Sequence, residues 1–564
     1  MQIGEFMKSR EVQLSDIAGK SFDLCVIGGG ATGAACALDA QLRGLRTVLL
    51  DAVDFAGATS STATKIIHGG VRYLEEAIKD VDPKEYHVVV RALHERVRML
   101  DNAPHLTRRL EFLVPSFHWL DVAYLDIGLK IYDWLAGSAR ISPSKFVSRE
   151  ETLRRMSQLN PDGLLGSVEY ADGQFDDARY NLALVQSFAE AGGQALNHYR
   201  VTEFHRDLAG RLSGVVAVDQ ITGASLNLNA LVIVNATGPA SDVVRQMASP
   251  TVPKRMRLSK GSHILFPLDL FPTDDAMLIP KTEAGSVLFA VPWGGRLLVG
   301  TTEREVSPGD DLYVTEEEIN YMLRQLNKYL AKPLLPSDIV SGFAGARPLV
   351  IGGQGESTQK LARDDVIEID PKSGLISIMG GKWTTHRAMA EDTINAVQSA
   401  LGRAVSESPT RAHLLHGGQG FTSDLWEELV RIYPVSKETA QHLSAKFGSA
   451  AWNVLELTRA NGSLAEPLIP GSAQIQAEVV YAVREELAAS IEDVISRRIG
   501  LQYYSWRDAI KAAPVVGCLM AQELQWTNVQ LQEAVTRYVE RINFFLQRAG
   551  LQPGAGRVGR SSAA

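Results

Sequence analysis

The sequence predicts an α/β fold with three parts: a Rossmann-like nucleotide-binding domain, a substrate domain with an antiparallel sheet, and an all-helical C-terminal domain. Three observations support this prediction. A glycine-rich strand–turn–helix opens the chain, short strands recur through its middle, and helical segments dominate after about residue 408. The 564 residues are also too many for one compact core.

The first element is a dinucleotide-binding fingerprint. An apolar strand runs into Gly28, Gly30 and Gly33, which have the spacing G-x-G-x-x-G. A second apolar strand ends at Asp51, about 20 residues later, as the fingerprint requires. In such a pattern the first glycine permits a tight turn, the second admits a pyrophosphate and the third brings helix and strand together, while the acid binds an adenosine ribose. The alternative is a glycine-rich turn in an ordinary βαβ unit.

The elements that follow indicate a discontinuous first domain. A polar helix is expected over 85–100, and a buried strand over 231–234 leads into Asn235. Short strands then predict the antiparallel substrate sheet, at 262–265, 277–279, 287–291 and 296–299. A capping box, Thr315 with Glu318, opens a helix in that region. Near residues 380–385 a strand again passes into a helix, which returns the chain to the first domain.

These patterns divide the chain as follows. We expect a flexible N-terminal tail over 1–20 and interleaved nucleotide-binding and substrate (cap) domains over 21–404. A helical C-terminal domain is expected over 405–550 and a disordered tail over 551–564. We interpret the pair Arg497 and Arg498, in the helical domain, as solvated surface.

Composition excludes several classes of function. The net charge of −8 argues against a general nucleic-acid surface. The three cysteines, Cys25, Cys36 and Cys518, have no metal-binding or disulfide pattern, so we expect no metal and a reducing, cytoplasm-facing compartment. No apolar run is long enough to span a bilayer, and no secretory signal is present.

Further motifs occur in a fixed order along the chain. They are residues 58–61, 67–74, 235–239, 260–263, 292–293, 300–302, 346–349, 363–364, 380–382, 477–486 and 497–498. Together they resemble the FAD-dependent (aerobic-type) glycerol-3-phosphate dehydrogenases, a family within the glycine-oxidase-like flavoproteins. The resemblance covers roughly residues 21–545. Two departures are Glu303, where the family often has Asp, and His386, where it often has Tyr.

The resemblance implies a function. The enzyme would oxidise sn-glycerol 3-phosphate to dihydroxyacetone phosphate by hydride transfer from C2 to N5 of FAD, and would pass the electrons to membrane quinone. The alternative is a glycerol-3-phosphate oxidase that reduces oxygen to hydrogen peroxide. The family implies a peripheral enzyme on the cytoplasmic face of the inner membrane, in contact with lipid, and allows a homo-oligomer. Residues 119–135 carry aromatic side chains that would lie either at a bilayer interface or in the core.

The resemblance also implies site residues. Three arginines match the substrate site, because a guanidinium binds two phosphate oxygens at once: Arg72, Arg347 and Arg363. His68 is the first candidate for the base and His263, also assigned to the substrate site, is the second. Lys382 is expected to act near the flavin and, with His68 and Arg347, completes the catalytic set. The cofactor set is Gly28, Gly30, Gly33, Asp51, Ser60, Ser61, Thr62, Gly69, Thr237, Gly238, Gly381, Lys382 and Thr384.

Other readings remain open from the residues alone. Each arginine, taken singly, suits a surface ion pair, and each histidine suits a structural role. An amine or amino-acid oxidase on the same fold would need only one arginine for a carboxylate. An NAD-dependent dehydrogenase would not need the segment around residues 380–382 to complete its cofactor site. A flavin-bound protein without catalytic activity is a third rival.

Overall fold

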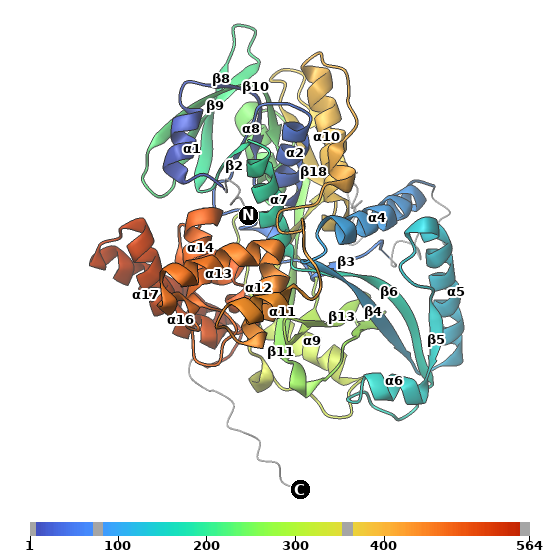
Figure 1. Cartoon of the computed structure of the whole chain (residues 1–564). Coiled ribbons are helices and arrows are strands. Elements are labelled where there is room, and N and C mark those ends of the chain that lie inside the picture. The colour runs from blue at the N-terminus through green and yellow to red at the C-terminus, as the bar shows by residue number, and fades with distance from the viewer. Residues whose placement is uncertain (1–6, 71–82, 352–364, 553–564) are drawn as a thin grey trace.

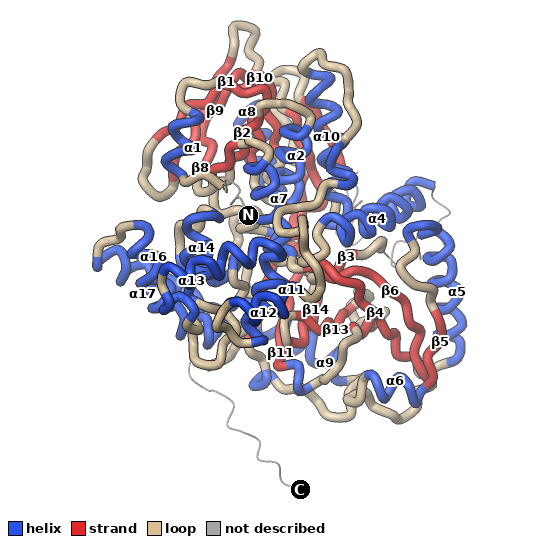
Figure 2. The backbone as a smooth tube through the Cα atoms, in the orientation of Figure 1, coloured by secondary structure: helices blue, strands red, loops and turns tan. Residues whose placement is uncertain are grey.

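Two sheets carry the fold, as Figure 2 shows in red. The computed structural model describes residues 7–70, 83–351 and 365–552. One sheet holds the predicted nucleotide-binding domain and the other holds the predicted cap domain. Both alternate with helices along the chain, so the predicted discontinuous α/β fold class is confirmed.

The first sheet has eight strands drawn from distant parts of the chain. Its main path is β17 (Asp365–Ile369), β18 (Ile376–Gly380), β10 (Ser225–Asn235), β1 (Ser21–Ile27), β2 (Thr47–Leu50) and β7 (Gln194–Leu196). The central pairs β18–β10, β10–β1, β1–β2 and β2–β7 are parallel. An antiparallel extension is formed by β8 (Tyr199–Arg206) and β9 (Leu212–Asp219). The carboxyl ends of β1, β2, β10 and β18 therefore meet at one edge, although their residues come from separate segments of the chain.

The second sheet has ten strands and is mostly antiparallel. It contains β3 (Ile66–Ile67), β4 (Thr107–Ser116), β5 (Lys145–Ser148), β6 (Gly166–Phe175), β11 (Met256–Pro267), β12 (Ala276–Ile279), β13 (Leu288–Trp293), β14 (Arg296–Gly300), β15 (Arg304–Val306) and β16 (Ser341–Val350). The strands predicted within 262–299 lie here, and β12 with β4 is a parallel pair. The predicted capping box of Thr315 and Glu318 begins α9 (Glu316–Asn327).

Helices cover both sheets. Those of the first part are α1 (Arg10–Ile17), α2 (Ala31–Leu42), α4 (Pro83–Asn102), α5 (Trp119–Ala136), α6 (Arg149–Arg155), α7 (Asp177–Glu190), α8 (Ser241–Ala248) and α10 (His386–Ala400). The C-terminal region has α11 (Leu425–Ile432), α12 (Lys437–Phe447), α13 (Ala451–Ala460), α14 (Gln476–Glu486), α15 (Leu501–Tyr504), α16 (Trp506–Leu524) and α17 (Asn528–Arg548). In Figure 1, α5 lies at the edge of the molecule opposite α16 and α17.

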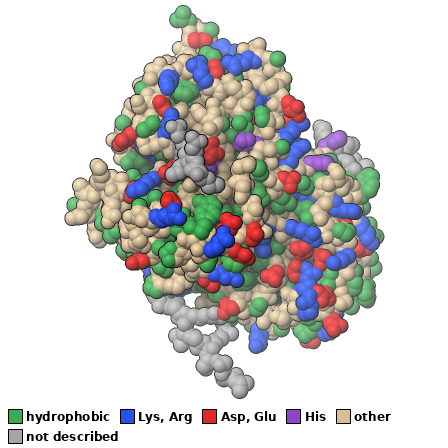
Figure 3. Space-filling view, viewed as in Figure 1, with side chains coloured by type: hydrophobic (Ala, Val, Ile, Leu, Met, Phe, Trp, Pro, Cys, Tyr) green, Lys and Arg blue, Asp and Glu red, His purple; other side chains and the backbone are tan. Residues whose placement is uncertain are grey.

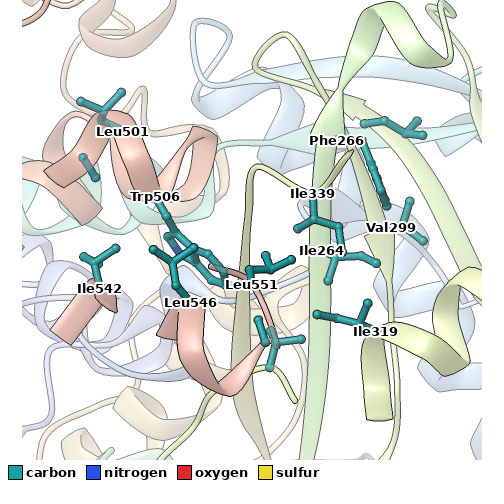
Figure 4. Close-up of a cluster of buried hydrophobic side chains, with 14 of the residues drawn as sticks. Ile264, Phe266, Val299, Ile319, Ile339, Leu501, Trp506, Ile542, Leu546 and Leu551 are labelled. Atoms are coloured by element: carbon teal, nitrogen blue, oxygen red, sulfur yellow. The ribbon is translucent and has the colours of Figure 1, made fainter. Parts of the chain in front are cut away.

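The helical region shares a core with the cap sheet. Ile264 and Val299, from β11 and β14, belong to the same buried cluster as Trp506 and Leu546, from α16 and α17 (Figure 4). A second cluster lies wholly within the helical region, around Leu443 and Tyr481. The C-terminal helices thus have a core of their own and also depend on the cap sheet for burial.

Two expectations differ from the structure. The expected N-terminal tail contains α1, whose Gln13 and Ile17 are buried, because the Gln13 side chain accepts a hydrogen bond from Ala195 N on β7. Arg497 and Arg498 are buried rather than solvated. Their ion pairs with Asp54 compensate the cost of burying their charges. Residues 1–6 and 553–564 of the expected tails lie outside the described part of the chain.

Charges of both signs are interspersed on the face shown in Figure 3. Neither sign of charge dominates this face. Cys25 and Cys36 are buried, as expected of small apolar side chains in the first strand and helix, whereas Cys518 is exposed.

Candidate active site

The glycines of the fingerprint are required by close backbone contacts. Gly28 has φ +107°, and a Cβ there would lie 2.6 Å from the carbonyl oxygen of Ala236, the residue that follows β10. A Cβ on Gly33 would lie 1.8 Å from the carbonyl oxygen of Gly28. No side chain fits at either position, so α2 begins in direct contact with the strand ends.

Gly30 has a different role in the same turn. It is the N-cap of α2, and a Cβ there would approach only the Ser60 hydroxyl, at 2.9 Å. The same hydroxyl accepts a hydrogen bond from Ala31 N, also at 2.9 Å. The first turn of α2 therefore offers N–H groups to an anion with only a small polar side chain beside them, which suits a pyrophosphate.

Asp51 lies directly after β2, next to this turn. Its carboxylate accepts hydrogen bonds from Gly29 N at 2.6 Å and from Val53 N at 2.9 Å. Burial raises the pKa of Asp51 from its ordinary 3.8 to about 6, although these two N–H groups act in the opposite direction. An acid held in this way is suited to accept hydrogen bonds from ribose hydroxyls.

The other parallel strands bring further predicted residues to the same edge. Thr237 follows β10 and donates its hydroxyl to Asn235 Oδ1 at 2.7 Å, and Gly238 has φ +52°. Gly381 follows β18 with φ +79°, and a Cβ there would lie 2.4 Å from the sulfur of Met389. The described residues thus provide a glycine-lined cradle at the strand ends, which fits an extended dinucleotide such as FAD.

The segment around residues 382–384 joins the cradle to the predicted base. Thr384 Oγ1 accepts from His68 N at 3.3 Å and donates to His68 O at 3.2 Å. Trp383 Nε1 donates to Ser60 O at 3.0 Å. Lys382 caps the short helix that begins here. Three segments far apart in the sequence, near residues 60, 68 and 383, are therefore fixed against one another.

The remaining predicted hydroxyls, Ser61 and Thr62, lie in the short helix at Thr59–Ser61 and just after it. Thr62 Oγ1 bonds to the carbonyl oxygen of Thr59 at 3.2 Å, and Ser61 is buried. Gly345 on β16 leaves room for Thr62, because a Cβ on Gly345 would lie 2.1 Å from the Thr62 hydroxyl. This loop is therefore held against the cap sheet.

Two of the predicted catalytic residues line one cavity. It encloses about 970 Å³ between the cap sheet and α5, and its wall includes His68, Arg347, Thr301 and Glu303. Arg347 donates from Nη2 to Thr301 Oγ1 at 2.9 Å. Gly261 opposite makes space for this guanidinium, since a Cβ on Gly261 would lie 2.5 Å from Arg347 Nη2. A cationic fork and an imidazole therefore share a cavity large enough for a small metabolite.

His263 lies behind the wall of this cavity and does not line it. It is buried, stacks on Phe343 with ring centroids 4.8 Å apart, and reaches the wall through Thr64 Oγ1, 3.0 Å from Nε2. Burial lowers the pKa of His263 well below its ordinary value, and the positive charges of Arg347 and Lys65 lower it further. This geometry disfavours both of its predicted roles, substrate binding and second candidate for the base.

Lys65 is a buried residue that the motifs did not single out. Its ammonium bonds to Asp177 at 2.5 Å and to Ser61 O at 2.8 Å, and lies 4.9 Å from the ring centroid of Phe343. It therefore fixes the loop that carries Ser61 and lies on the far side of His263. A lone lysine between hydroxyl residues and an apolar strand was the only signal in the sequence.

A second unforeseen group supports the loop at Gly69. Tyr132 on α5 accepts from Gly69 N at 2.8 Å and donates to Asp172 at 3.1 Å, and Asp172 is paired with Arg96 at 2.5 Å. A Cβ on Gly69 would lie 2.7 Å from the Tyr132 hydroxyl, which explains a glycine here. The residue next to His68 is thus held by α5. The predicted arginines Arg72 and Arg363 lie outside the described residues.

The sequence of this chain is similar to those of known FAD-dependent proteins. Residues 23–392 match the family "FAD dependent oxidoreductase", and residues 408–531 match the "C-terminal domain of alpha-glycerophosphate oxidase". The mitochondrial glycerol-3-phosphate dehydrogenase of Rattus norvegicus is 37% identical over 537 residues, which cover 93% of this chain and 74% of the relative. The human protein gives the same values.

Two solved structures of flavoproteins have a similar fold. The glycerol-3-phosphate dehydrogenase of Bacillus halodurans, complexed with FAD, superposes with a TM-score of 0.75 and 29% identity, covering 98% of this chain and 100% of that one. The L-alpha-glycerophosphate oxidase of Mycoplasma pneumoniae shares the fold at a TM-score of 0.54 and 16% identity, over 69% of this chain and 97% of its own. Within the described residues, no helix is both long and apolar enough to cross a bilayer.

Proposed function

Because the chain belongs to the FAD-dependent glycerol-3-phosphate dehydrogenases, within the wider FAD-dependent oxidoreductase family, we propose specific roles for its site residues and a quinone as its electron acceptor. The chain is an FAD-dependent enzyme that oxidises glycerol 3-phosphate. The observation that supports the roles most directly is the single cavity shared by His68 and Arg347.

Arg347 binds the substrate phosphate in this proposal. Its guanidinium is held by Thr301 and faces the space left by Gly261, so its donors are fixed before substrate arrives. The sequence adds Arg72 and Arg363 as further phosphate ligands. A dianionic phosphate is matched by several arginines, whereas a carboxylate substrate needs fewer.

His68 accepts the proton from the C2 hydroxyl. Its backbone is fixed by Thr384 on one side, and the neighbouring Gly69 is held by Tyr132 on the other, so the imidazole is positioned at the wall of the cavity. Bound FAD supplies the two-electron acceptor for the carbon-bound hydrogen. Lys382, at the N-cap of the short helix Trp383–Thr385, would supply positive charge to a flavin that gains electrons.

The cofactor site is the cradle at the strand ends. Gly28, Gly30 and Gly33 admit the pyrophosphate at the N-terminus of α2, and Asp51 accepts the ribose hydroxyls. We assign the other predicted cofactor residues to the same site: Ser60, Ser61, Thr62, Gly69, Thr237, Gly238, Gly381, Lys382 and Thr384.

The acceptor proposal rests on α5. The exposed fractions of Trp119, Leu120 and Trp134 are 64, 84 and 73%. The opposite face of the same helix contributes Leu129 to the cavity wall and Tyr132 to the support of Gly69. Exposed tryptophans among aliphatic side chains suit the interface of a bilayer. We therefore place the outer face of α5 on lipid at the cytoplasmic side of the inner membrane, where quinone reaches the flavin.

One experiment tests the chemistry. Adding glycerol 3-phosphate without oxygen should bleach the flavin absorbance of the purified protein, and His68→Gln should slow the limiting rate of this reduction by about 10²–10⁴-fold. The apparent substrate affinity should change much less. His263→Gln is the comparison, because that imidazole lies behind the cavity wall. An unchanged limiting rate in His68→Gln would move the base to another group.

A second experiment decides the acceptor. Turnover should be fast with a soluble quinone analogue and slow with oxygen alone. Binding to anionic lipid vesicles should weaken when Trp119 and Trp134 become Gln, with flavin content unchanged. Stoichiometric peroxide at full turnover, without stimulation by quinone, would instead establish the oxidase, which the match of residues 408–531 to an oxidase domain keeps as the second candidate.

A further inference from the structure

A second cavity lies between the cap sheet and the C-terminal helices. It encloses about 740 Å³, with β4, β6 and the turn between β13 and β14 on one side, and with α12 and the loop at 469–474 on the other. It shares no described lining residue with the cavity that contains His68 and Arg347. A ligand here would therefore occupy a site separate from the catalytic one.

Two arginines line this cavity with part of each guanidinium unused. Arg108 donates from Nε to Gln174 Oε1 at 2.7 Å and from Nη2 to the carbonyl oxygen of Pro292 at 3.2 Å. Arg296 donates from Nε to the carbonyl oxygen of Tyr504 at 2.8 Å and from Nη1 to that of Gly295 at 3.1 Å. All of these acceptors are neutral, and no described carboxylate forms an ion pair with either side chain. Both forks are therefore held in place without an ion pair, although the charges of Asp274 and Glu111 also act on Arg108.

The carboxylates in the same cavity are already engaged. Asp176 pairs with Lys446 at 2.8 Å, and that lysine is buried. Asp508 pairs with Lys511 at 3.1 Å. Since these two carboxylates have cationic partners of their own, the excess charge of the cavity wall is the positive charge of the two arginines.

A buried imidazole adds an unsatisfied polar atom. His105 lines the cavity with 7% of its surface exposed, and no described residue gives its Nδ1 a hydrogen-bond partner. Burial lowers the pKa of His105 to about 3, and the nearby Arg179 and His416 act in the same direction. The ring is therefore neutral at physiological pH. The neutral ring adds no charge to the cavity wall, and its Nδ1 is buried within the protein, so the two arginines are the ligand-binding groups that the cavity offers.

We propose that this cleft between the cap sheet and the helical region binds a small soluble dianion, either a phosphate monoester or a dicarboxylate. Arg108 and Arg296 supply the charge-assisted donors. Because both guanidiniums are already fixed by neutral acceptors, binding orders little more of the side chains and loses little entropy. The volume suits a metabolite of modest size.

The test uses holoenzyme that carries Arg347→Lys, because the catalytic cavity also attracts phosphate. Isothermal titration with inorganic phosphate and, separately, with malonate measures binding, and the tighter of the two identifies the class of ligand. Adding Arg108→Gln and Arg296→Gln together should weaken that binding at least tenfold. Adding Arg324→Gln, an exposed arginine on α9 paired with Glu283, should leave it unchanged.

Two results would overturn the proposal: no saturable binding of either anion, or binding that the double substitution leaves within twofold. Flavin content and far-ultraviolet circular dichroism establish that the double variant is folded. If it is not, each single substitution is tested alone, and a loss of at least threefold in both is then expected. Unchanged binding in both single variants would also refute the site.

Discussion

At the scale of single residues, function depends on how each polar group is held. Arg347 illustrates this: its Nη2 donates to Thr301, and the missing side chain of Gly261 leaves the space that the same end of the guanidinium occupies. A flexible cation in the same place would carry the same charge without the same geometry. The arginine is therefore expected to contribute through its shape as well as its charge.

The first prediction follows from this geometry. Arg347→Lys should lower kcat/KM for glycerol 3-phosphate about tenfold or more, because a charge-assisted hydrogen bond is worth roughly 1.5–3 kcal/mol. FAD content should be unchanged. Steady-state kinetics with a quinone analogue measure the effect. Arg324→Lys is the matched control, because Arg324 is an exposed residue of α9. A kcat/KM within twofold of the parent would remove Arg347 from the phosphate site.

The second prediction concerns pH and Asp51. Its pKa of about 6 lies above the ordinary value, so the folded apoprotein holds this proton more tightly than the unfolded chain does. The stabilisation of the folded apoprotein by protonated Asp51 is fully present below about pH 4, and it is lost as the pH rises through about 6. The ionised form accepts ribose hydroxyls best, so FAD should bind more tightly at pH 7 than at pH 5.

Fluorescence titration of apoprotein with FAD measures this dependence. Asp51→Asn should bind FAD more weakly at pH 7 and should flatten the change between pH 5 and 7. The same slope in the parent and in Asp51→Asn would assign the pH dependence to another group.

At the scale of elements, the turn between β1 and α2 was the most predictable part of the molecule. Most of its requirements are local: Gly33 must pack on the carbonyl oxygen of Gly28, and Gly28 has a positive φ, although the backbone at Ala236 that Gly28 also contacts comes from a distant segment. The burial of Arg498 was not predictable in this way, because its partner Asp54 lies 444 residues earlier in the chain. The position of His263 behind the cavity wall likewise depends on Thr64, which is distant in sequence.

The third prediction tests the turn. Gly30→Val should leave a folded protein with greatly reduced FAD content, because the new side chain meets only the Ser60 hydroxyl but fills the space in front of the first N–H groups of α2. The ratio of flavin to protein absorbance measures the loss. Gly44→Val is a useful contrast, since that glycine has open space around it, although its φ of +78° adds strain. Full flavin content in Gly30→Val would contradict the role of this turn.

At the scale of the whole molecule, a buried ionic cluster joins the helical region to the cofactor domain. Arg498 bonds to both carboxylate oxygens of Asp54, one of them at 2.8 Å, and Arg497 bonds to Asp54 at 2.5 Å. Asp54 lies three residues after Asp51. His198 extends the cluster through Asp493 at 3.0 Å. The C-terminal helices therefore support the loop that carries the ribose-binding acid.

The fourth prediction follows from this cluster. Arg498→Met should destabilise the protein by about 3–5 kcal/mol, because it leaves Asp54 buried with one partner fewer. It should also weaken FAD binding. Arg484→Met, at an exposed ion pair with Glu523, is the control and should cost about 0–1 kcal/mol. Denaturant unfolding and FAD titration measure both effects. Equal stability of the two variants would show that the cluster is not a structural link.

The parallel order of β2, β1, β10 and β18 has a consequence for synthesis of the chain. A ribosome makes roughly 5–20 residues per second, so roughly 15–65 s separate the appearance of Asp51 from that of Lys382. Within that interval β10 joins β1, and β18 is the last of the four parallel strands to be made. The strand-end cradle is therefore complete only after β18 and the segment that follows it have been made. We expect flavin to be taken up by a nearly finished polypeptide.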